Sequence, residues 1–532
     1  MRHITILALA TITGIACAQS VALNVNVNQN RRAINPNIYG VAYASRAQLS
    51  DLNATLNRQG GNPTTRYNWQ QNVDNRGSDW FFQSIPYASS APGAYVDTFV
   101  QNTRDGGAQA LVTMPMIDWV AKTGPGRSKL TSFSVAKYGA QQYSDPGWAN
   151  SGNGIRANGQ LITGNDANDA STPNSTGLQA GWVDHLTQRF GNSLQGGVKY
   201  FCLDNEPSIW FESHRDVAPT GLTMRQARDK MVAYSTAIKD RDPNALALGP
   251  EEWGWGGFIY SGFDQQAGAA NGYTSFPDRA ANGNMDYALW LLKEMRLAST
   301  RAGRRLLDIF TLHYYPQGGE FSDDVSNNMQ LLRNRSTRSL WDPNYTDTSW
   351  INDKVKLIPR MKQWVSSNYP NTPIGLTEYN WGAENHINGA TAQADCLGIF
   401  GREGLDMATR WTTPPANSFA YNAFKMYRNY DGRKSTFGNT SVLATAPNPD
   451  NIAIFAAVRS TDNALTIMTI NKQRTINANA TINLTGVTGN RVVEVYQLKS
   501  NNRITKLANL QTNANKIVTA LPAQSITLFV VK

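Results

Sequence analysis

The segment VKYFCLDNEP, residues 198–207, decides the fold, because an apolar run that ends in polar and acidic residues is typical of a buried parallel strand with a functional end. Glu206 follows the run directly, and Pro207 restricts the backbone beside it. The segment PIGLTEYN, residues 373–380, has the same arrangement, with Glu378 at the end of its apolar run. The two segments therefore predict two strands of one parallel sheet, each with a carboxyl group at its end.

Outward from these segments, short apolar runs alternate with stretches of helical character from residue 37 onward. Such alternation is typical of an α/β protein built from β-α units, and eight strands close a (β/α)8 TIM-like barrel. We expect this barrel over residues 37–430, with a helix over Met224–Asp240 that Thr223 caps. The expected strands are Ile38–Ala44, Thr64–Trp69, Ala110–Ile117, Val198–Leu203, Ala245–Gly249, Ile309–Tyr314, Pro373–Thr377 and Ser418–Met426.

Beyond the barrel, the sequence changes to short alternating stretches such as ALTIMTINK and SITLFVVK. Apolar residues at every second position, with turn residues between the stretches, predict an antiparallel β-sandwich over residues 431–532. The segment VALNVNVN, residues 21–28, alternates in the same way. We therefore expect residues 19–36 to add an N-terminal strand to the sandwich.

Composition excludes several classes of protein. Of the 532 residues, 41% are hydrophobic and only 17% are charged, which excludes a disordered chain or a coiled coil. The net charge of +10 permits binding to a polyanion, but there is no run of five basic residues and no nucleic-acid-binding motif. We expect a solvated basic surface and no nucleic-acid partner.

The N-terminus has the features of a secretory signal peptide over residues 1–18. Arg2 precedes the apolar stretch Ile4–Ala16, and Ala16-Cys17-Ala18 forms a small-x-small cleavage site. We expect secretion with cleavage after Ala18, no membrane span and a monomer; lipid attachment at Cys17 is the alternative. The remaining Cys202 and Cys396 lack the spacing of a zinc site, and we expect buried free thiols, with a single disulfide as the alternative.

Two carboxyl groups that converge from separate strands suit the cleavage of a glycosidic bond, in which one group donates a proton and the other meets the cationic sugar carbon. A separation of about 5–5.5 Å favours retention and about 6.5–9.5 Å inversion, which the sequence does not fix. Glu251 and Glu252, in GPEEWGWG, also follow an expected strand and are the rival candidates. The structural alternative is that the glutamates are unrelated surface residues that cap helices.

Several stretches run in order over residues 64–382: RYNWQ with SDWFF, TMPMIDWVAK, SFSVAKYG, GGVKYFCLDNEPSIW, GPEEWGWGGF, DIFTLHYYP and PIGLTEYNWG. In these stretches the chain resembles glycoside hydrolase family 44. The resemblance implies a retaining endo-β-1,4-glucanase that acts on cellulose derivatives or xyloglucan without a catalytic cofactor or metal. It further implies that Glu206 is the acid/base and Glu378 the nucleophile.

Other residues are placed around the acids by their position along the chain. We expect Asn205 to bind the 2-hydroxyl of the sugar, and Arg66 and Tyr315 to hold Glu378 ionised. His313 is expected to be a hydrogen-bonded barrel residue and not a metal ligand. Asp166 and Asp169 can bind a structural calcium ion, with a solvated turn as the alternative.

Tryptophans at strand ends can stack on sugar rings, and each can equally be a core residue. We expect Trp69, Trp210 and Trp381 to bind the β-glucan because they lie nearest the matched motifs. The wider set contains Trp80, Trp119, Trp253, Trp255 and Trp411. The alternative functions are a hydrolase of mannan or xylan and a polysaccharide-binding protein without catalytic activity.

Overall fold

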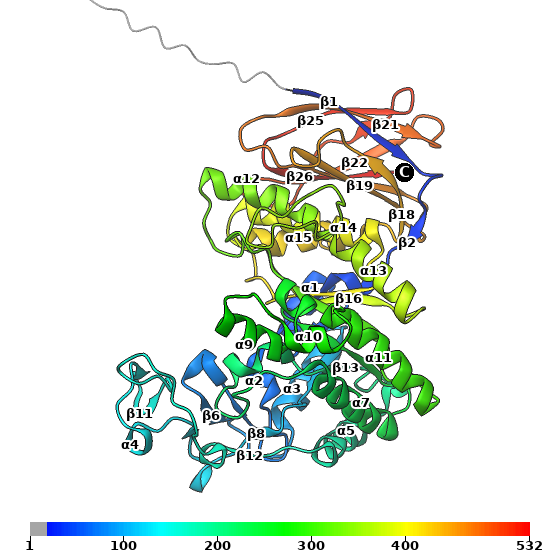
Figure 1. Ribbon diagram of the computed structural model, residues 1–532. Helices are drawn as coiled ribbons and strands as arrows, with labels where there is room; N and C mark the ends of the chain where they lie inside the picture. The colour runs from blue at the N-terminus through cyan, green and yellow to red at the C-terminus, as the bar shows by residue number, and fades with distance from the viewer. Residues whose placement is uncertain (1–18) are drawn as a thin grey trace, which may run out of the picture.

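The computed structural model describes residues 19–532, which form a barrel with a sandwich on one side of it (Figure 1). The expected signal peptide, residues 1–18 with Cys17, lies outside the described residues. Within residues 19–532, no helix has both the length and the apolar composition needed to cross a membrane. Cys202 and Cys396 are buried free thiols, as expected.

Eight parallel strands close the barrel, which confirms the predicted (β/α)8 fold. The strands are β3 (Gly40–Ala42), β4 (Leu56–Arg58), β7 (Gln109–Met114), β13 (Tyr200–Leu203), β14 (Leu246–Glu252), β15 (Ile309–Tyr314), β16 (Ile374–Tyr379) and β17 (Met407–Arg410). One long helix follows each strand: α1 (Arg46–Leu52), α3 (Ala94–Asp105), α5 (Thr176–Phe190), α7 (Met224–Arg241), α11 (Tyr287–Ala302), α13 (Leu357–Asn368), α14 (Ile387–Glu403) and α15 (Phe419–Arg428). Thr223 caps α7 through a capping box with Gln226, as expected.

Two of the expected strands are wrong. Thr64–Trp69 contains the end of a short helix, α2 (Asn62–Thr65), and Ser418–Met426 is the cap and first part of α15. The true second and eighth strands, LNR in β4 and MATR in β17, are short and polar, so neither forms an apolar run. In α15, by contrast, the apolar residues recur at helical spacing and bury one face.

Alternation within the short strands sorts the barrel interior into layers. Leu56 belongs to an apolar cluster with side chains from β7, β13, β14, β15 and β17. Arg58 lies two residues further along β4 and contacts four polar side chains from other parts of the barrel. They are Asn205 after β13, Glu251 in β14, His313 in β15 and Glu378 in β16. Because side chains of a strand alternate in direction, the apolar residue and the arginine lie on the same face at different depths.

The sandwich consists of eleven strands, and its own apolar core lies between its layers. The N-terminal strand β1 (Gln19–Asn26) pairs antiparallel with β18 and parallel with β21, so one pair in this otherwise antiparallel sheet is parallel. The remaining strands are β2 (Arg32–Ala33), β18 (Thr440–Thr445), β19 (Ile452–Val458), β20 (Leu465–Asn471), β21 (Ala478–Thr485), β22 (Val492–Leu498), β23 (Thr505–Lys506), β24 (Leu510–Gln511), β25 (Lys516–Leu521) and β26 (Ser525–Val531).

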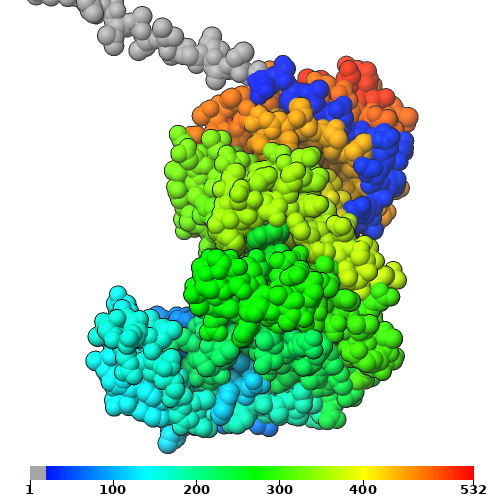
Figure 2. Space-filling model, viewed as in Figure 1, coloured from blue at the N-terminus to red at the C-terminus, as the bar shows by residue number. Residues whose placement is uncertain are grey.

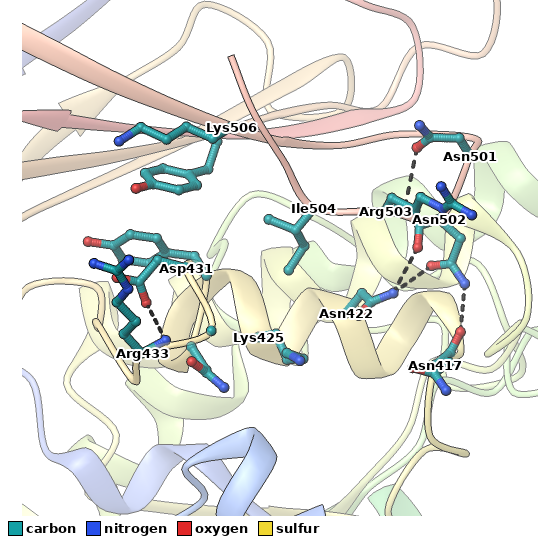
Figure 3. A pocket seen from close by; sticks show the side chains of 14 residues that line it. Asn417, Asn422, Lys425, Asp431, Arg433, Asn501, Asn502, Arg503, Ile504 and Lys506 are labelled. Carbon is teal, nitrogen blue, oxygen red and sulfur yellow. Dashed lines mark hydrogen bonds between the residues drawn. The ribbon is translucent and has the colours of Figure 1, made fainter. Parts of the chain in front are cut away.

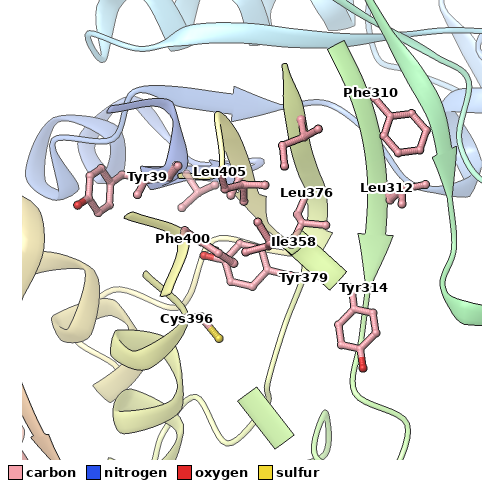
Figure 4. Packing of buried hydrophobic residues seen from close by; sticks show 14 of the residues in the cluster. Tyr39, Phe310, Leu312, Tyr314, Ile358, Leu376, Tyr379, Cys396, Phe400 and Leu405 are labelled. Carbon is pink, nitrogen blue, oxygen red and sulfur yellow. The ribbon is translucent and has the colours of Figure 1, made fainter. Parts of the chain in front are cut away.

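Helix α14 joins the two parts of the molecule. On one side Phe400 packs edge-on against Tyr379 of the barrel, with ring centroids 5.0 Å apart (Figure 4). On the other side Gly398 lies so close to Phe455 of β19 that a Cβ there would be 2.2 Å from its ring. Asp395 forms a buried ion pair with Lys472 at 2.6 Å. The sandwich therefore braces the barrel through a helix that is buried on nearly all sides.

A lobe built from the long connection between β7 and α5 projects from the barrel, drawn in cyan at the lower left of Figures 1 and 2. It contains β8 (Trp119–Ala121), β9 (Leu130–Thr131), α4 (Val135–Tyr138), β10 (Ser144–Asp145), β11 (Trp148–Gly152) and β12 (Ser171–Pro173). The lobe thus includes the Asn- and Gly-rich segment 144–173.

Candidate active site

Two glutamates face each other at the carboxyl end of the barrel. Glu378 lies in β16, and Glu206 follows β13 just before Pro207. One carboxylate oxygen of each residue lies within 4.8 Å of the other, and a ring nitrogen of His313 lies within the same distance of both. The fold therefore brings two acids that are remote in the sequence to one point.

The backbone is strained beside these acids. Asp204, Glu206 and Glu251 have positive φ angles of 68°, 48° and 58°. Residues other than glycine rarely adopt this region of backbone conformation. Such residues cluster at active sites, where the surrounding structure holds them in place. Here the backbone N–H of Glu206 donates to the carbonyl oxygen of Glu251 at 3.0 Å, which ties the ends of two neighbouring strands together.

Arg58 is the cation that holds Glu378. Its Nη1 donates to Glu378 Oε1 at 2.5 Å, and its Nη2 donates to Asn205 Oδ1 at 3.0 Å and to Glu251 Oε2 at 3.3 Å. The side chain is completely buried. Its planar fork thus fixes three acceptors from three strand ends, which a point charge such as lysine cannot do.

Tyr315 and His313 complete the contacts of the two acids. Tyr315 Oη donates to Glu378 Oε2 at 2.8 Å, which is the contact expected from the sequence. His313 Nδ1 lies 2.8 Å from Glu206 Oε1, and its Nε2 lies 3.2 Å from Glu251 Oε2. The surrounding carboxylates outweigh burial and raise the pKa of His313 to about 9, so the ring is a cation at neutral pH. A protonated ring donates from both nitrogens.

The electrostatic environment distinguishes Glu206 from the other acids. Burial raises the pKa of Glu206, and the hydrogen bond and charge of His313 oppose part of this increase. Glu378 instead accepts hydrogen bonds from a guanidinium and a phenol. The pair therefore consists of one carboxyl group that retains its proton more readily and one held by donors, as general acid and nucleophile require.

Neither rival acid has the position of a catalytic group. Glu251 is fully buried; burial raises its pKa, but His313 and Arg58 outweigh this effect and lower it overall. Glu252 is also fully buried and accepts from Ser208 Oγ at 2.5 Å, and burial raises its pKa to about 8. Glu251 therefore anchors the two cations below the site, and Glu252 is a neutral acid that fixes the turn carrying Glu206.

Asn205 lies between the arginine and the loop after β4. Its Oδ1 accepts from Arg58 and from the backbone N–H of Gly61 at 3.1 Å, and its Nδ2 donates to Asn62 Oδ1 at 3.3 Å. The amide is therefore oriented with its oxygen held by the protein. Its NH₂ group, which has a second N–H, is the donor available to a sugar hydroxyl.

The expectation that Arg66 holds Glu378 is wrong. Arg66 Nη1 pairs with Asp216 Oδ1 at 3.0 Å, and its Nη2 donates to Ser171 Oγ at 2.5 Å. Both ionic groups are fully buried. Arg66 follows the short helix α2, whereas the second strand of the barrel, β4, carries Arg58.

Two of the three favoured tryptophans are buried, and Trp69 is half-buried. Trp210 and Trp381 are each only 2% exposed and donate to Asn205 O and Ser336 Oγ, so for both the stacking expectation is wrong. Trp69 donates to Leu178 O and packs on His185 of α5. Trp210 and Trp381 therefore belong to the hydrophobic core.

Two other tryptophans among the described residues have exposed rings, and a third lies half-buried beside Arg58. Trp80 is 47% exposed and Trp350 58% exposed, and Trp411, at the end of β17, is half-buried with Arg58 lying 5.8 Å from its ring centroid. Trp350 Nε1 donates to Gln317 Oε1, and Gln317 Nε2 donates to Tyr315 O, so Trp350 is linked to the catalytic end of β15. Sequence reasoning missed Trp350, which follows no strand.

The acids considered for calcium have protein partners. Asp169 accepts from Lys137 Nζ and Tyr138 Oη, both at 2.5 Å. Asp166 caps a short helix by accepting from the backbone N–H of Asn168 at 2.9 Å. A structural calcium ion remains a prediction.

The chain is similar to known proteins of one enzyme family. The family model for glycoside hydrolase family 44 matches residues 73–318. Endoglucanase A of Paenibacillus lautus is 32% identical, with 97% of this chain and 73% of the relative covered. Beta-mannanase/endoglucanase A of Caldicellulosiruptor saccharolyticus is 29% identical, and the chain spans 38% of its length.

Solved structures extend the comparison over the whole fold. CelM2, a bifunctional glucanase-xylanase from a metagenome library, is 57% identical with a TM-score of 0.96, covering 96% of this chain and 99% of that one. A family 44 xyloglucanase from Paenibacillus polymyxa is 30% identical with a TM-score of 0.81, covering 97% and 100%. The paired glutamates thus lie in a glycoside hydrolase, and the chain belongs to glycoside hydrolase family 44.

Proposed function

We propose that the protein is a retaining endo-β-1,4-glucanase that hydrolyses internal bonds of β-glucans such as cellulose derivatives and xyloglucan. The observation that carries the mechanism is the separation of at most 4.8 Å between oxygens of Glu206 and Glu378. Retaining enzymes have carboxyl groups about 5–5.5 Å apart, whereas inverting enzymes keep them about 6.5–9.5 Å apart to admit a water. The substrate class is supported by the relatives, which are named endoglucanases and xyloglucanases.

In the first step, Glu378 attacks the anomeric carbon while Glu206 protonates the departing glycosidic oxygen. Because Glu206 Oε1 accepts from His313, Oε2 is the atom that carries this proton. The Glu206 carboxylate left behind is stabilised by the His313 cation. Asn205 Nδ2 donates to the 2-hydroxyl of the sugar, a contact that strengthens in the transition state.

In the second step, Glu206 removes a proton from a water molecule, and that water attacks the anomeric carbon and releases Glu378. Arg58 and Tyr315 then hold the restored carboxylate in its starting position. The acid/base can change role because the negative charge of Glu378 is absent from the covalent intermediate, which lowers the proton affinity of Glu206.

The proposal is tested by the configuration of the products. In ¹H NMR of cello-oligosaccharide hydrolysis, the β-anomer is expected to appear first; an initial α-anomer would contradict the double displacement. Glu378→Ala is expected to abolish turnover, and azide to restore it with a glycosyl azide of inverted configuration. Glu403→Ala, at the end of α14 and remote from the site, is the matched control and should retain activity.

A second activity on xylan is favoured by one observation. CelM2, described as a bifunctional glucanase-xylanase, shares 57% of its residues with this chain over nearly its whole length. We therefore expect measurable release of reducing sugar from xylan as well as from β-glucan. A substrate panel that includes mannan separates these activities, and no release from xylan would remove the second one.

We also propose that the protein is secreted, because residues 1–18 have the order of features found in a signal peptide. N-terminal sequencing of protein from the culture medium should begin at Gln19. A protein that stays in the cell pellet with Met1 intact would contradict export.

A further inference from the structure

A polar groove of about 860 Å³ lies between α15 of the barrel and the β22–β23 region of the sandwich (Figure 3). Its volume falls in the range of ligand-binding sites. Asn422 and Lys425 of α15 line one wall, together with residues just before and after the helix, and the loop after β22 lines the other. The groove is therefore formed by both parts of the molecule.

The groove carries excess positive charge. Among the described residues that line it, four are cationic and one, Asp431, is acidic. Lys425 pairs with Asp51 at 2.8 Å, and Lys506 lies 3.4 Å from Glu494. Within residues 19–532, the guanidinium groups of Arg433 and Arg503 form no ion pair or hydrogen bond. These two arginines are therefore the cations available to a ligand.

Each of the two arginines is presented by the same kind of turn. Asp431 Oδ1 accepts from the backbone N–H of Arg433 at 2.9 Å, and Asn501 Oδ1 accepts from that of Arg503 at 3.2 Å. Such Asx turns fix the backbone two residues on. Figure 3 shows Arg433 toward one end of the groove and Arg503 toward the other. The turns fix the backbone from which each of the two arginine side chains starts.

Between the arginines, the walls offer amide groups. Asn422 and Asn502 bond across the groove at 2.9 Å, which fixes the width at that point. The side-chain amides of Asn417 and the Nδ2 atom of Asn501 make no hydrogen bond with any described residue. Amide groups both donate and accept, which suits sugar hydroxyls, and guanidinium forks match carboxylates.

We propose that this groove is a second carbohydrate site, distinct from the catalytic cleft, that binds acidic oligosaccharides whose hexuronate carboxylates pair with Arg433 and Arg503. The site would attach the enzyme to uronate-bearing polymers while the catalytic acids cleave neutral glucan. Arg433 and Arg503 contribute to the net charge of +10, and in this proposal they bind a ligand. A nucleic acid fits less well, because single-strand sites stack bases on aromatic rings and the two tyrosines here are only 5% and 6% exposed.

The test uses a full-length Glu378→Gln variant, so that binding is measured without turnover. Isothermal titration compares an oligogalacturonate with its carboxyl-reduced neutral form. We expect binding of the acidic oligomer alone, weakened about tenfold or more by Arg433→Gln with Arg503→Gln. The matched control, Arg301→Gln with Arg474→Gln, removes the same charge elsewhere and should leave the affinity unchanged. Hydrolysis of neutral β-glucan by the double Arg433/Arg503 variant in the active enzyme should also be unchanged.

Three outcomes would overturn the proposal. Equal losses in the groove variant and the control would show a general charge effect, and equal binding of the neutral oligomer would remove the role of the carboxylates. Tighter binding of a single-stranded oligonucleotide, lost in the groove variant, would identify a nucleic-acid surface instead. The proposed hydrolase activity is measured separately on neutral glucan, so its failure is distinguishable from that of the second site.

Discussion

Replacing Arg58 with lysine tests which arginine serves the nucleophile. Lysine keeps the positive charge but can reach only one of the three acceptors that the guanidinium holds, on Glu378, Asn205 and Glu251. A charge-assisted hydrogen bond is worth about 1.5–3 kcal/mol. If one of the two lost bonds acts in the transition state, kcat/KM should fall by about tenfold to 150-fold, since each tenfold step corresponds to about 1.36 kcal/mol.

Arg66→Lys is the matched control, because Arg66 is equally buried and holds Asp216 instead of an acid of the catalytic pair. It should lower the free energy of unfolding by about 1.5–3 kcal/mol and change kcat/KM by less than about twofold. Initial rates on an aryl β-cello-oligosaccharide and urea denaturation measure the two quantities. Retention of wild-type kcat/KM in Arg58→Lys, or an equal loss in a folded Arg66→Lys, would refute the reasoning.

Three further changes have defined outcomes. Glu252→Gln should stabilise the fold increasingly between pH 4.5 and about 8, because the unfolded chain releases the Glu252 proton near pH 4.5 while the folded protein retains it to about 8. If the urea midpoints of the variant and the wild type differ by the same amount at pH 5 and at pH 8, this reasoning is contradicted. His313→Gln should move the alkaline limb of the kcat/KM profile to higher pH, because the cation that lowers the pKa of Glu206 is removed; an unchanged or lower limb would exclude that role. Trp350→Ala should raise KM for polymer by about twofold to tenfold with kcat retained, and a loss of kcat alone would show that Trp350 is no stacking platform.

The two acids that converge in the structure could be predicted because their signal is local. Both Glu206 and Glu378 follow a continuous apolar run, and such runs mark buried parallel strands wherever the chain has them. The same rule fails for β4, which has one apolar residue in three. The third residue of β4 is the buried Arg58, and the carboxylates that pair with it come from other strands. No pattern in the residues next to Arg58 therefore indicates its role.

The tryptophans illustrate a different limit. Trp210 and Trp381 lie within matched motifs, yet their rings pack in the core, whereas Trp350 lies in a loop and is open to solvent. Exposure depends on which side chains from distant segments cover a ring, and this information is absent from the neighbouring residues. Motif proximity therefore located the paired acids but not the exposed tryptophan.

The pairing of β1 with β21 means that the sandwich can finish folding only late in synthesis of the chain. Gln19–Asn26 is synthesised near the start of the chain, and its parallel partner Ala478–Thr485 is made more than four hundred residues later. Until then the first strand has an open edge on a growing polypeptide, a condition that invites pairing with the wrong neighbour. A ribosome-bound chain that stops short of residue 478 should therefore depend on chaperones more than the finished protein does.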